Sequence, residues 1–369
     1  MVSRFVAEPP HGQASRIGII LCNLGTPAAP TPRAVRAYLR EFLSDPRVVE
    51  IPRLLWWPIL HGIILPTRPS KSAAKYAKVW LPEGSPLLVW TERQAQYLRG
   101  ELGERLKARG LPWDLVHIEV GMRYGEPSLA SAWEKLRAQR CDRLLLLPLY
   151  PQYASSTTGS ACAALFRLLE RERHVPAVRT VRSWHDDPDY IGALAASVRR
   201  AWQQYGRPQV LVMSFHGVPR FALERGDPYH CLCQKTGRLL AEVLGLDSGQ
   251  YRIAFQSRFG RAEWLRPYTD ETLESLARTG VRSVHVICPG FPADCLETLE
   301  EIAIEGRERF LAAGGSSYYY IPALNDSAQF VRMLARLAED HLSGWLAAPP
   351  DREQLALQLA RARALGAPA

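Results

Sequence analysis

The chain has 369 residues, of which 47% are hydrophobic and 22% are charged, as in ordinary folded globular proteins. A single hydrophobic core rarely grows this large, so the length predicts about two domains. The net charge of +9 comes from Arg and Lys residues dispersed along the chain, without a basic patch interleaved with aromatic residues. This pattern argues against a nucleic-acid partner and weakly favours an anionic small molecule or membrane surface.

The cysteines are an odd number and are scattered. They stand at positions 22, 141, 162, 231, 233, 288 and 295. The first residues lack the basic, apolar and small-residue regions of a secretory leader, so we expect a reduced, cytoplasmic protein. No apolar run reaches the roughly 18 residues that span a bilayer, and the sequence predicts no transmembrane helix.

Short apolar strands alternate with helices along the chain. The first predicted strand, 17–22, precedes a helix that Thr31 caps and Pro32 begins, and a long helical stretch covers 91–109. Further strands are predicted at 115–120, 143–147, 178–182, 209–216, 251–255 and 283–288, with helices near Ser160, after Pro188 and at the C-terminal end. This order predicts an α/β fold with two doubly wound parallel sheets facing one another across a cleft.

Residues 54–65 (LLWWPILHGIIL) form an apolar run that Pro58, His61 and Gly62 interrupt. It is either a packed turn and helix, or an apolar lip that rests on a membrane or covers a hydrophobic ligand. The sequence leaves both interpretations open.

A strand that ends on a histidine is the centre of the predicted site. The four consecutive apolar residues 210–213 favour a buried strand, and Gly217 and Pro219 prevent it from continuing. His216 is therefore expected at the carboxyl edge of the strand, where open α/β sheets bind ligands. A core histidine paired with a backbone carbonyl is the alternative.

A helix capped by Asp294 is predicted to follow the last strand. Glu297, Glu301 and Glu305 recur every four residues and so share one face of that helix. A solvated acidic face is the ordinary interpretation of Glu301 and Glu305. Glu297 lies in the first turn, where it could share a cleft with His216, and such a pair can bind a divalent first-row metal and accept protons.

Other chemistries lack their motifs. The chain has no Gly-x-Gly-x-x-Gly after a strand and no P-loop, and residues 213–217 are not the Gly-x-Ser-x-Gly elbow of a hydrolase. His230, Cys231 and Cys233 resemble half of a metal knuckle, but no second pair follows at zinc-site spacing. Unpaired thiols in a helix are the favoured interpretation.

Several motifs, in the correct order, resemble the ferrochelatase family, whose members insert ferrous iron into a porphyrin. The two most specific are residues 214–219 (SFHGVP) and 294–299 (DCLETL). The others are 23–27 (NLGTP), 84–86 (GSP), 123–124 (RY), 150–153 (YPQY), 156–160 (STTGS), 226–229 (GDPY) and 256–257 (QS). The resemblance therefore covers most of the chain.

The resemblance implies two Rossmann-like domains, as in class II chelatases, with the porphyrin in the cleft between them. It implies an N-terminal domain over 14–152 that carries the porphyrin lip, with Trp56 and Trp57 in it. A C-terminal domain over 153–320 would carry His216 and Glu297, and a helical segment over 321–369 would pack back on the first domain.

The resemblance also implies roles for individual residues. His216 and Glu297 would be catalytic, binding iron and accepting protons, and Glu301 and Glu305 would form a polar path for metal or protons. The residues expected near the porphyrin are Leu24, Tyr76, Arg123, Tyr150, Trp264 and Phe291.

The chain departs from familiar relatives in its cysteines. Animal-type members have a histidine two residues before the key glutamate, where this chain has Cys295, so metal contact there stays open, as does a role for Cys231 and Cys233. Relatives with a [2Fe–2S] cluster use cysteines near the Ser-Thr-Thr-Gly run and in a C-terminal extension. Here Ser155 stands near that run and no cysteine follows Cys295. We expect no cluster and no prosthetic group, with Fe²⁺ as a substrate.

The expected function is that of a lyase that inserts Fe²⁺ into protoporphyrin IX to give protoheme, the terminal step of heme biosynthesis. Its partners would be porphyrin and ferrous iron, without nucleic acid, and peripheral contact with the inner membrane stays open. A coproporphyrin ferrochelatase, a cobalt or nickel tetrapyrrole chelatase and a non-enzymatic tetrapyrrole carrier are the alternatives, because His/Glu sites are not very metal-selective.

Overall fold

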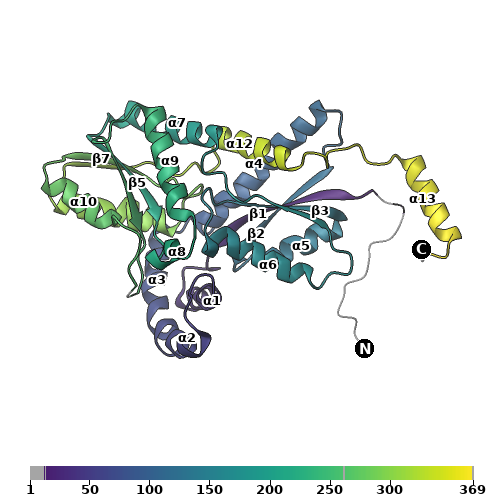
Figure 1. The fold of residues 1–369 in the computed structure, drawn as a ribbon, viewed down its shortest axis with the longest axis horizontal. Helices are drawn as coiled ribbons and strands as arrows, with labels where there is room; N and C mark the ends of the chain where they lie inside the picture. Colours follow the sequence, from purple (N-terminus) through teal and green to yellow (C-terminus); the bar gives the residue numbers. More distant parts are fainter. Residues whose placement is uncertain (1–11, 13, 261, 368–369) are drawn as a thin grey trace.

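The structure, a computed structural model, describes residue 12 and residues 14–260 and 262–367. Each half of the molecule is built on a four-stranded parallel sheet, and the two sheets lie at opposite ends of the main body (Figure 1). This architecture confirms the predicted α/β fold with two doubly wound parallel sheets.

The first sheet has the strand order β2-β1-β3-β4. Its strands are β1 (Arg16–Gly25), β2 (Val116–Tyr124), β3 (Cys141–Pro148) and β4 (Ala177–Thr180). β1 is central because residues 17–22 are buried on both faces, and it pairs in parallel with β2 and β3.

The second sheet repeats this order as β6-β5-β7-β8. Its strands are β5 (Val210–His216), β6 (Tyr251–Gln256), β7 (Ser283–Ile287) and β8 (Ser317–Tyr320). β5 is the central strand here, and its residues 210–215 are all buried. The carboxyl end of β5 thus lies between neighbours, where ligand sites of open α/β sheets form.

Helices connect the strands, and three of the segments are π-helical (η). They are α1 (Pro32–Leu43), α2 (Arg53–Ile59), η1 (Leu60–Ile64), α3 (Leu65–Val79), α4 (Pro86–Ala108), α5 (Leu129–Ala138), η2 (Ser155–Gly159), α6 (Ser160–Leu169), α7 (Pro188–Tyr205), α8 (Arg220–Glu224), α9 (Tyr229–Leu244), α10 (Thr269–Arg278), η3 (Glu297–Gly306), α11 (Arg307–Ala312), α12 (Ala328–His341) and α13 (Arg352–Ala364). The Thr31 hydroxyl accepts a hydrogen bond from the Ala34 amide at 3.4 Å, so the predicted cap of the first helix is confirmed.

The first sheet extends beyond residue 152, where we expected the first domain to end. β4 pairs with residues 143–146 of β3, so the sheet is complete only at Thr180. The C-terminal segment also packs differently from the expectation, because α12 lies against both α4 and α7 rather than on the first half alone. Both differences arise because β4 completes the first sheet and α12 packs on two helices, although each lies far along the chain from its partners.

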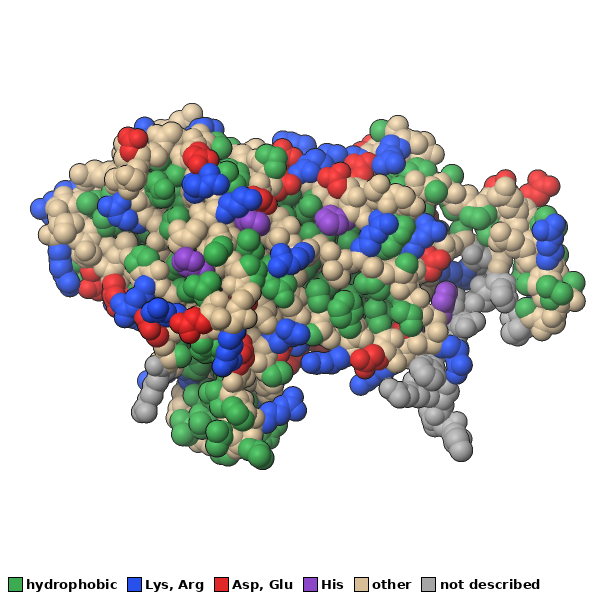
Figure 2. All heavy atoms as spheres, viewed as in Figure 1, with side chains coloured by type: hydrophobic (Ala, Val, Ile, Leu, Met, Phe, Trp, Pro, Cys, Tyr) green, Lys and Arg blue, Asp and Glu red, His purple; other side chains and the backbone are tan. Residues whose placement is uncertain are grey.

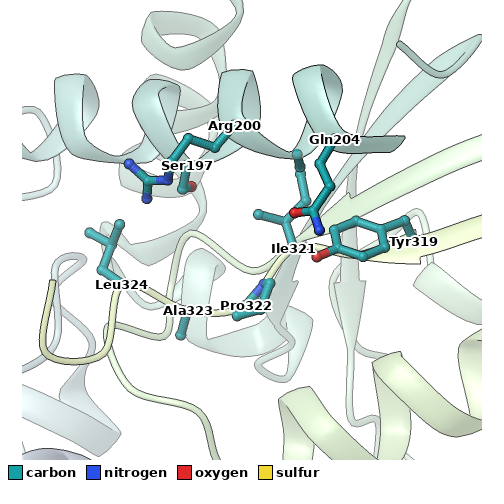
Figure 3. A pocket seen from close by; sticks show the side chains of 9 residues that line it. Ser197, Arg200, Gln204, Tyr319, Ile321, Pro322, Ala323 and Leu324 are labelled. Atoms are coloured by element: carbon teal, nitrogen blue, oxygen red, sulfur yellow. The ribbon is translucent and has the colours of Figure 1, made fainter. Parts of the chain in front are cut away.

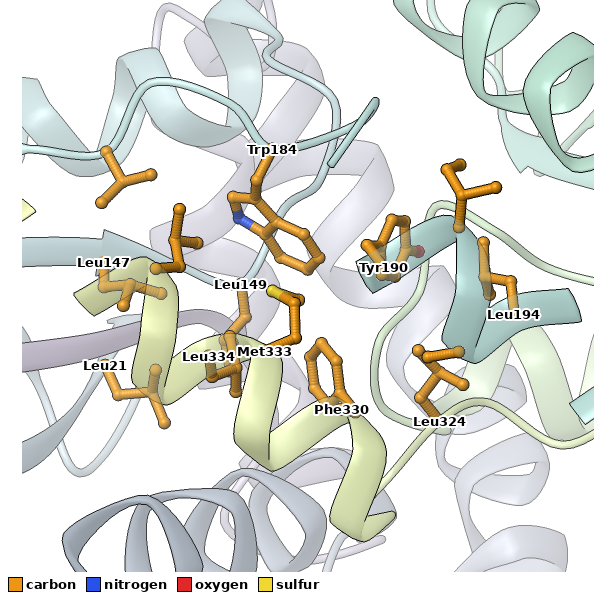
Figure 4. Packing of buried hydrophobic residues seen from close by; sticks show 14 of the residues in the cluster. Leu21, Leu147, Leu149, Trp184, Tyr190, Leu194, Leu324, Phe330, Met333 and Leu334 are labelled. Atoms are coloured by element: carbon orange, nitrogen blue, oxygen red, sulfur yellow. The ribbon is translucent and has the colours of Figure 1, made fainter. Parts of the chain in front are cut away.

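One hydrophobic core runs through both halves of the molecule. Phe330, Met333 and Leu334 of α12 lie beside Trp184 and Tyr190 in the middle of it (Figure 4). The indole ring of Trp184 packs edge-on against Tyr190 at 4.8 Å between ring centroids. The two sheets are therefore held by a shared core and not by a hinge alone.

A helical projection formed by α2, η1 and the start of α3 extends from the main body (Figure 1). Trp56 and Leu60 are buried in a small cluster with Leu43, whereas Leu54 is 91% exposed and Ile63 58% exposed. Hydrophobic side chains gather on the surface of this projection (Figure 2). One face of the apolar run thus packs as a helix, as the first interpretation predicts, and the other face is exposed; its contact with a membrane or a ligand stays a prediction.

No helix in the described part of the chain is long and apolar enough to cross a membrane. None of the seven cysteines forms a disulfide, and Cys231 and Cys233 lie in α9, which confirms the helix predicted there; the absence of a metal at His230, Cys231 and Cys233 stays a prediction.

Candidate active site

His216 lies half-buried at the carboxyl end of β5, as predicted. Its Nδ1 atom is 2.6 Å from the carbonyl oxygen of Gly217. Because a carbonyl oxygen only accepts hydrogen bonds, Nδ1 carries the proton of the neutral ring and Nε2 keeps the lone pair. The imidazole therefore retains one basic nitrogen for a ligand, and the backbone contact orients it.

The glycine after His216 is required by close packing. A Cβ atom at Gly217 would lie 2.9 Å from the carbonyl oxygen of Gln256 and 3.1 Å from the indole of Trp264. The rings of Trp264 and Phe291 flank His216 at 6.4 and 6.3 Å between centroids. The histidine thus has aromatic neighbours on two sides, which limit how its ring can turn.

Glu297 begins η3, a π-helix where the sequence predicted an α-helix. The side-chain amide of Gln256 donates to the carbonyl oxygen of Glu297 at 2.9 Å, which ties the start of η3 to the end of β6. π-Helical segments are rare and are frequent at functional sites. The strand ends of the second sheet and the start of η3 therefore form one connected unit.

The prediction that Asp294 caps this helix is wrong, because η3 has no side-chain cap. The buried carboxylate instead accepts hydrogen bonds from the hydroxyl groups of Thr298 and Tyr320, at 2.9 and 2.6 Å, and from the amide of Asn325 at 2.8 Å. Asp294 thus holds the segment after β8 against the loop that leads to Glu297.

Glu301 lies in the site and not on a solvated face. Its carboxylate accepts hydrogen bonds from the backbone amide of Ser257, at 2.7 Å, and from the Ser257 hydroxyl. Burial raises the pKa of Glu301 above its ordinary value of 4.5, while the Ser257 hydrogen bonds and the nearby His216 oppose the shift and Glu297 adds to it. His216 and Glu297 therefore both lie close enough to Glu301 to affect its charge.

Glu301 also lines a cavity of about 240 Å³ at the end of β6. The other lining residues are Phe255, Gln256, Ser257, Arg258, Tyr268, Asp270 and Arg309. Arg258 pairs with Asp270 at 3.0 Å on this rim. Glu301 therefore contacts both the site and a polar space beside it.

Glu305 differs from Glu297 and Glu301 because it forms an ion pair with a lysine. The Lys75 ammonium lies 2.6 Å from Glu305 and 2.8 Å from Glu300, and Lys78 lies 3.1 Å from Glu300. The Glu300 side chain is only 1% exposed. Two lysines from α3 therefore neutralise a buried acid that the sequence reasoning did not single out.

Tyr76 approaches the site from α3. Burial raises the pKa of its phenol well above 10, and the charge of Glu297 adds to the shift. Cys295 is likewise buried, which raises the pKa of its thiol, and Glu297 adds to this effect as well. Both groups therefore stay protonated beside Glu297, and Cys295 is a thiol rather than a thiolate.

Arg123 is held by an acid of the first half of the molecule. Its guanidinium lies 2.6 Å from Asp45, and its Nε atom donates to the Ser160 hydroxyl at 2.7 Å. Burial raises the pKa of the Tyr150 phenol, Cys22 adds to the shift, and the charge of Arg123 opposes it. Nη1 of Arg123 makes no hydrogen bond within the described residues, so one amino group stays available.

The structure thus brings together most of the predicted site residues. Leu24 and Phe291 pack in one apolar cluster with Cys295, next to the His216 side. Glu305 lies apart. Within the described residues, no group of three or more His, Cys, Asp or Glu side chains could hold a metal ion. A metal at His216 and Glu297 would therefore take its remaining ligands from elsewhere.

Sequence reasoning missed Asp45, Lys75 and Glu300. No local motif marks them, because each acts through a partner far along the chain. Ser257 could have been found, because it follows the strand end at Gln256 and belongs to a recognised motif.

Comparisons with known proteins identify the family of the chain. A family model described as Ferrochelatase matches residues 16–342. A protein named Ferrochelatase from Chromobacterium violaceum is 57% identical over 344 residues, covering 93% of each chain. Another, from an Azoarcus species, is 55% identical over 370 residues, covering 99% of each chain. Among solved structures, SirB from Bacillus subtilis with Fe³⁺ is 13% identical, with a TM-score of 0.49, and covers 68% of this chain and 90% of that one. By the family match and these identities, the chain belongs to the ferrochelatase family.

Proposed function

We propose that the protein inserts Fe²⁺ into protoporphyrin IX to form protoheme, the terminal step of heme biosynthesis. One observation supports this most directly: the imidazole of His216, whose Nδ1 contacts the Gly217 carbonyl and leaves Nε2 for a ligand, lies near two carboxylates, Glu297 and Glu301, at the strand ends of the second sheet. Membership in the ferrochelatase family supports the same reaction. A tetrapyrrole carrier would not need these proton-accepting groups.

The reaction exchanges one Fe²⁺ for two pyrrole protons. A flat macrocycle hides its nitrogen lone pairs from an incoming ion, and bending exposes them, so a site that prefers the bent ring lowers the barrier. In our proposal Nε2 of His216 accepts a pyrrole proton. Glu297 binds iron or passes protons on, and Glu301 continues the path.

Iron needs few protein ligands here, because the four porphyrin nitrogens become its ligands. His216 and Glu297 supply one nitrogen and one carboxylate, a combination suited to divalent first-row metals. Cys295 contributes no thiolate, since its pKa is raised by burial. We also propose that the chain carries no [2Fe–2S] cluster, because three or four thiolates within reach of one another are required and Ser155 stands beside the Ser-Thr-Thr-Gly run.

The porphyrin would lie against Leu24, Tyr76, Tyr150, Trp264 and Phe291. Arg123 would use its available Nη1 for a propionate while Asp45 holds the rest of the guanidinium in place. The exposed face of the projection around α2 would rest on the surface of the inner membrane.

The reaction is tested by anaerobic incubation of the purified protein with Fe²⁺ and either protoporphyrin IX or coproporphyrin III. Loss of free-porphyrin fluorescence and identification of the product report metallation. We expect faster turnover with protoporphyrin IX. A preference for coproporphyrin III would overturn the proposed substrate, and binding without metallation by Fe²⁺, Co²⁺ or Zn²⁺ would favour a carrier.

Two variants test the assigned groups in the same assay. His216→Ala and Glu297→Gln should each lower kcat by about 100-fold or more, because each removes a proton acceptor or metal ligand. His174→Ala and Glu308→Gln are matched controls at exposed positions and should keep full activity. Far-ultraviolet circular dichroism shows whether the folds are intact. Near-normal turnover of either site variant would remove that residue from the mechanism.

A further inference from the structure

A second cavity, of about 240 Å³, lies between α7 and the segment that follows β8. Its lining comes from Ser197, Arg200, Ala201 and Gln204 of α7, Tyr319 of β8, and Ile321, Pro322, Ala323 and Leu324. Gln204 points from the helix toward Ile321 and Tyr319, and the Arg200 side chain runs along the helix past Ser197, above Leu324 (Figure 3). None of these residues belongs to the proposed iron and porphyrin site.

The cation in this cavity has no acid to neutralise it. Within the described residues Arg200 makes no ion pair and no hydrogen bond. By contrast, Arg199 next to it donates to the carbonyl oxygen of Val243 at 2.6 Å. A guanidinium that lines a concave surface with its donors free is suited to a carboxylate, which it can bind through two parallel hydrogen bonds.

The opposite wall of the cavity is apolar and ordered. Ile321, Pro322 and Leu324 supply hydrocarbon surface below Arg200 and Gln204 (Figure 3). This wall is fixed from behind, because Tyr320 and Asn325 donate hydrogen bonds to the buried Asp294. A wall that is already ordered loses little conformational entropy when a ligand binds.

Tyr319 closes one end of the cavity with an aromatic ring. Its ring lies 4.0 Å from that of Tyr205 and 5.3 Å from that of the buried His285, measured between centroids. Burial and Tyr205 raise the pKa of the Tyr319 phenol to about 12, so it remains an uncharged hydroxyl. The cavity therefore presents one positive charge, neutral polar groups and apolar surface, with no negative charge among its lining residues.

We propose that this cavity binds a small monocarboxylate with a compact apolar body, with the carboxylate on Arg200 and the hydrocarbon part against Ile321, Pro322 and Leu324. The volume is below the range of about 300–1,000 Å³ typical of sites for drug-sized molecules, so the ligand is smaller than these. Gln204 supplies an additional amide donor.

Isothermal titration calorimetry of the full-length protein without porphyrin tests the proposal. Benzoate is the probe, because it combines one carboxylate with a compact ring, and benzamide is the uncharged counterpart of the same shape. We expect benzoate to bind at least about tenfold more tightly than benzamide, because only the carboxylate can form charge-assisted hydrogen bonds with Arg200.

Arg200→Ala should weaken benzoate binding by about tenfold or more, and Gln204→Ala by a smaller factor. Arg199→Ala and Gln203→Ala, adjacent exposed positions outside the cavity, are the matched controls and should bind like the unmodified protein. Equal affinities for benzoate and benzamide would overturn the proposal. Benzoate binding that survives Arg200→Ala would place the ligand elsewhere on the molecule and would overturn it as well. Ferrochelatase activity of the same variants, which we expect to be unchanged, separates this outcome from a failure of the proposed function.

Discussion

Glu301 and Glu305 lie about one turn apart on η3 and contact opposite kinds of partner. Ser257 donates two neutral hydrogen bonds to Glu301, whereas Lys75 forms an ion pair with Glu305 at 2.6 Å. A carboxylate without a cationic partner, next to His216, can exchange protons with the site. One that is fixed on a lysine is less free to do so.

The two acids should therefore differ in their importance for metallation. Glu301→Gln is expected to lower kcat by about tenfold or more, since a proton-accepting group is removed. Glu305→Gln should change kcat less than about threefold. Stopped-flow metallation of both variants under the same conditions makes the comparison. The opposite ranking would show that protons or iron pass along the Lys75 side.

The raised pKa of Glu301 also predicts how stability depends on pH. Between the ordinary pKa of 4.5 and the raised value, the folded protein binds more protons at this carboxyl than the unfolded chain does. Stability contributed by Glu301 must then fall as the pH rises through this window. Glutamine has no such dependence, so the Glu301→Gln variant should gain stability relative to the unmodified protein from pH 4.5 upward.

Urea unfolding at a series of pH values from 4.5 to 8 measures this difference, provided unfolding is reversible. Glu308→Gln, at an exposed position on the following helix, is the control and should show a small difference that does not change with pH. A pH-independent difference for Glu301→Gln would contradict the shifted pKa.

For single residues, the sequence identified those that carry the chemistry but not the partners that bind them. His216 could be placed because an apolar run, a histidine and a glycine follow one another locally. The environment of Glu301 could not, because Ser257 is 44 positions away in the chain. The ion pairs of Lys75 with Glu300 and Glu305, and that of Arg123 with Asp45, are likewise tertiary contacts. No periodicity in the sequence predicts them.

Among the elements, α3 and η3 are joined by a buried ion-pair cluster. Glu300 of η3 is almost fully buried and lies between Lys75 and Lys78 of α3. Replacing both lysines by methionine leaves the carboxylate uncompensated, which should lower the free energy of unfolding by about 2–4 kcal/mol.

Chemical denaturation near pH 7 measures this loss. Lys71→Met, at an exposed position of the same helix, should change the stability by less than about 0.5 kcal/mol. A Glu300→Gln exchange in the double-methionine background should restore part of the stability, because it removes the unpaired charge. Without such a recovery, the loss would be due to packing of the lysine stems.

The projection around α2 is the element expected to contact membranes. Leu54 and Leu55 are among its most exposed apolar side chains, so the Leu54→Glu/Leu55→Glu variant should keep its fold. Its binding to phosphatidylglycerol-containing vesicles in a sedimentation assay should fall by about tenfold or more, since each inserted leucine contributes roughly 1.5–3 kcal/mol. Val243→Glu/Leu357→Glu, at exposed apolar sites on other elements, is the control. If both variants lose vesicle binding equally, the added negative charge alone would explain the loss.

Element types could be predicted where the local pattern was strong. The strands that carry the site are consecutive apolar runs, and the structure confirms them. The π-helical form of η3 could not be predicted, because its apolar spacing also fits an α-helix over ten residues. Tertiary hydrogen bonds, such as that from Gln256 to the Glu297 carbonyl, contribute to the choice.

In the whole molecule, α12 contributes the last part of the shared core. A chain ending after residue 325 loses the seven buried residues of α12, including Phe330, Met333 and Leu334, and the buried Leu342. It should fail to unfold cooperatively and should bind a hydrophobic dye, whereas a chain ending after residue 346 should unfold cooperatively, because none of the described residues of α13 is buried. Thermal denaturation followed by circular dichroism distinguishes them. Cooperative unfolding of the shorter chain would show that each half is stable alone.

The number of sheets could be inferred from the number of predicted strands, but the boundary between the halves could not. β4 follows a long helical connection, and only its pairing with β3 assigns it to the first sheet. Likewise, an amphipathic C-terminal helix shows an apolar face in the sequence without showing that α4 and α7 lie opposite.

The shared core has a consequence for how the protein is made. Synthesis of β3 is complete at Pro148, whereas synthesis of α12, the helix that packs on α4 and α7, is complete only at His341. At synthesis rates of about 5–20 residues per second, apolar surface stays uncovered for roughly 10–40 seconds. We therefore expect the nascent chain to need protection from aggregation over this period, and a pause in the last third of the message to prolong it.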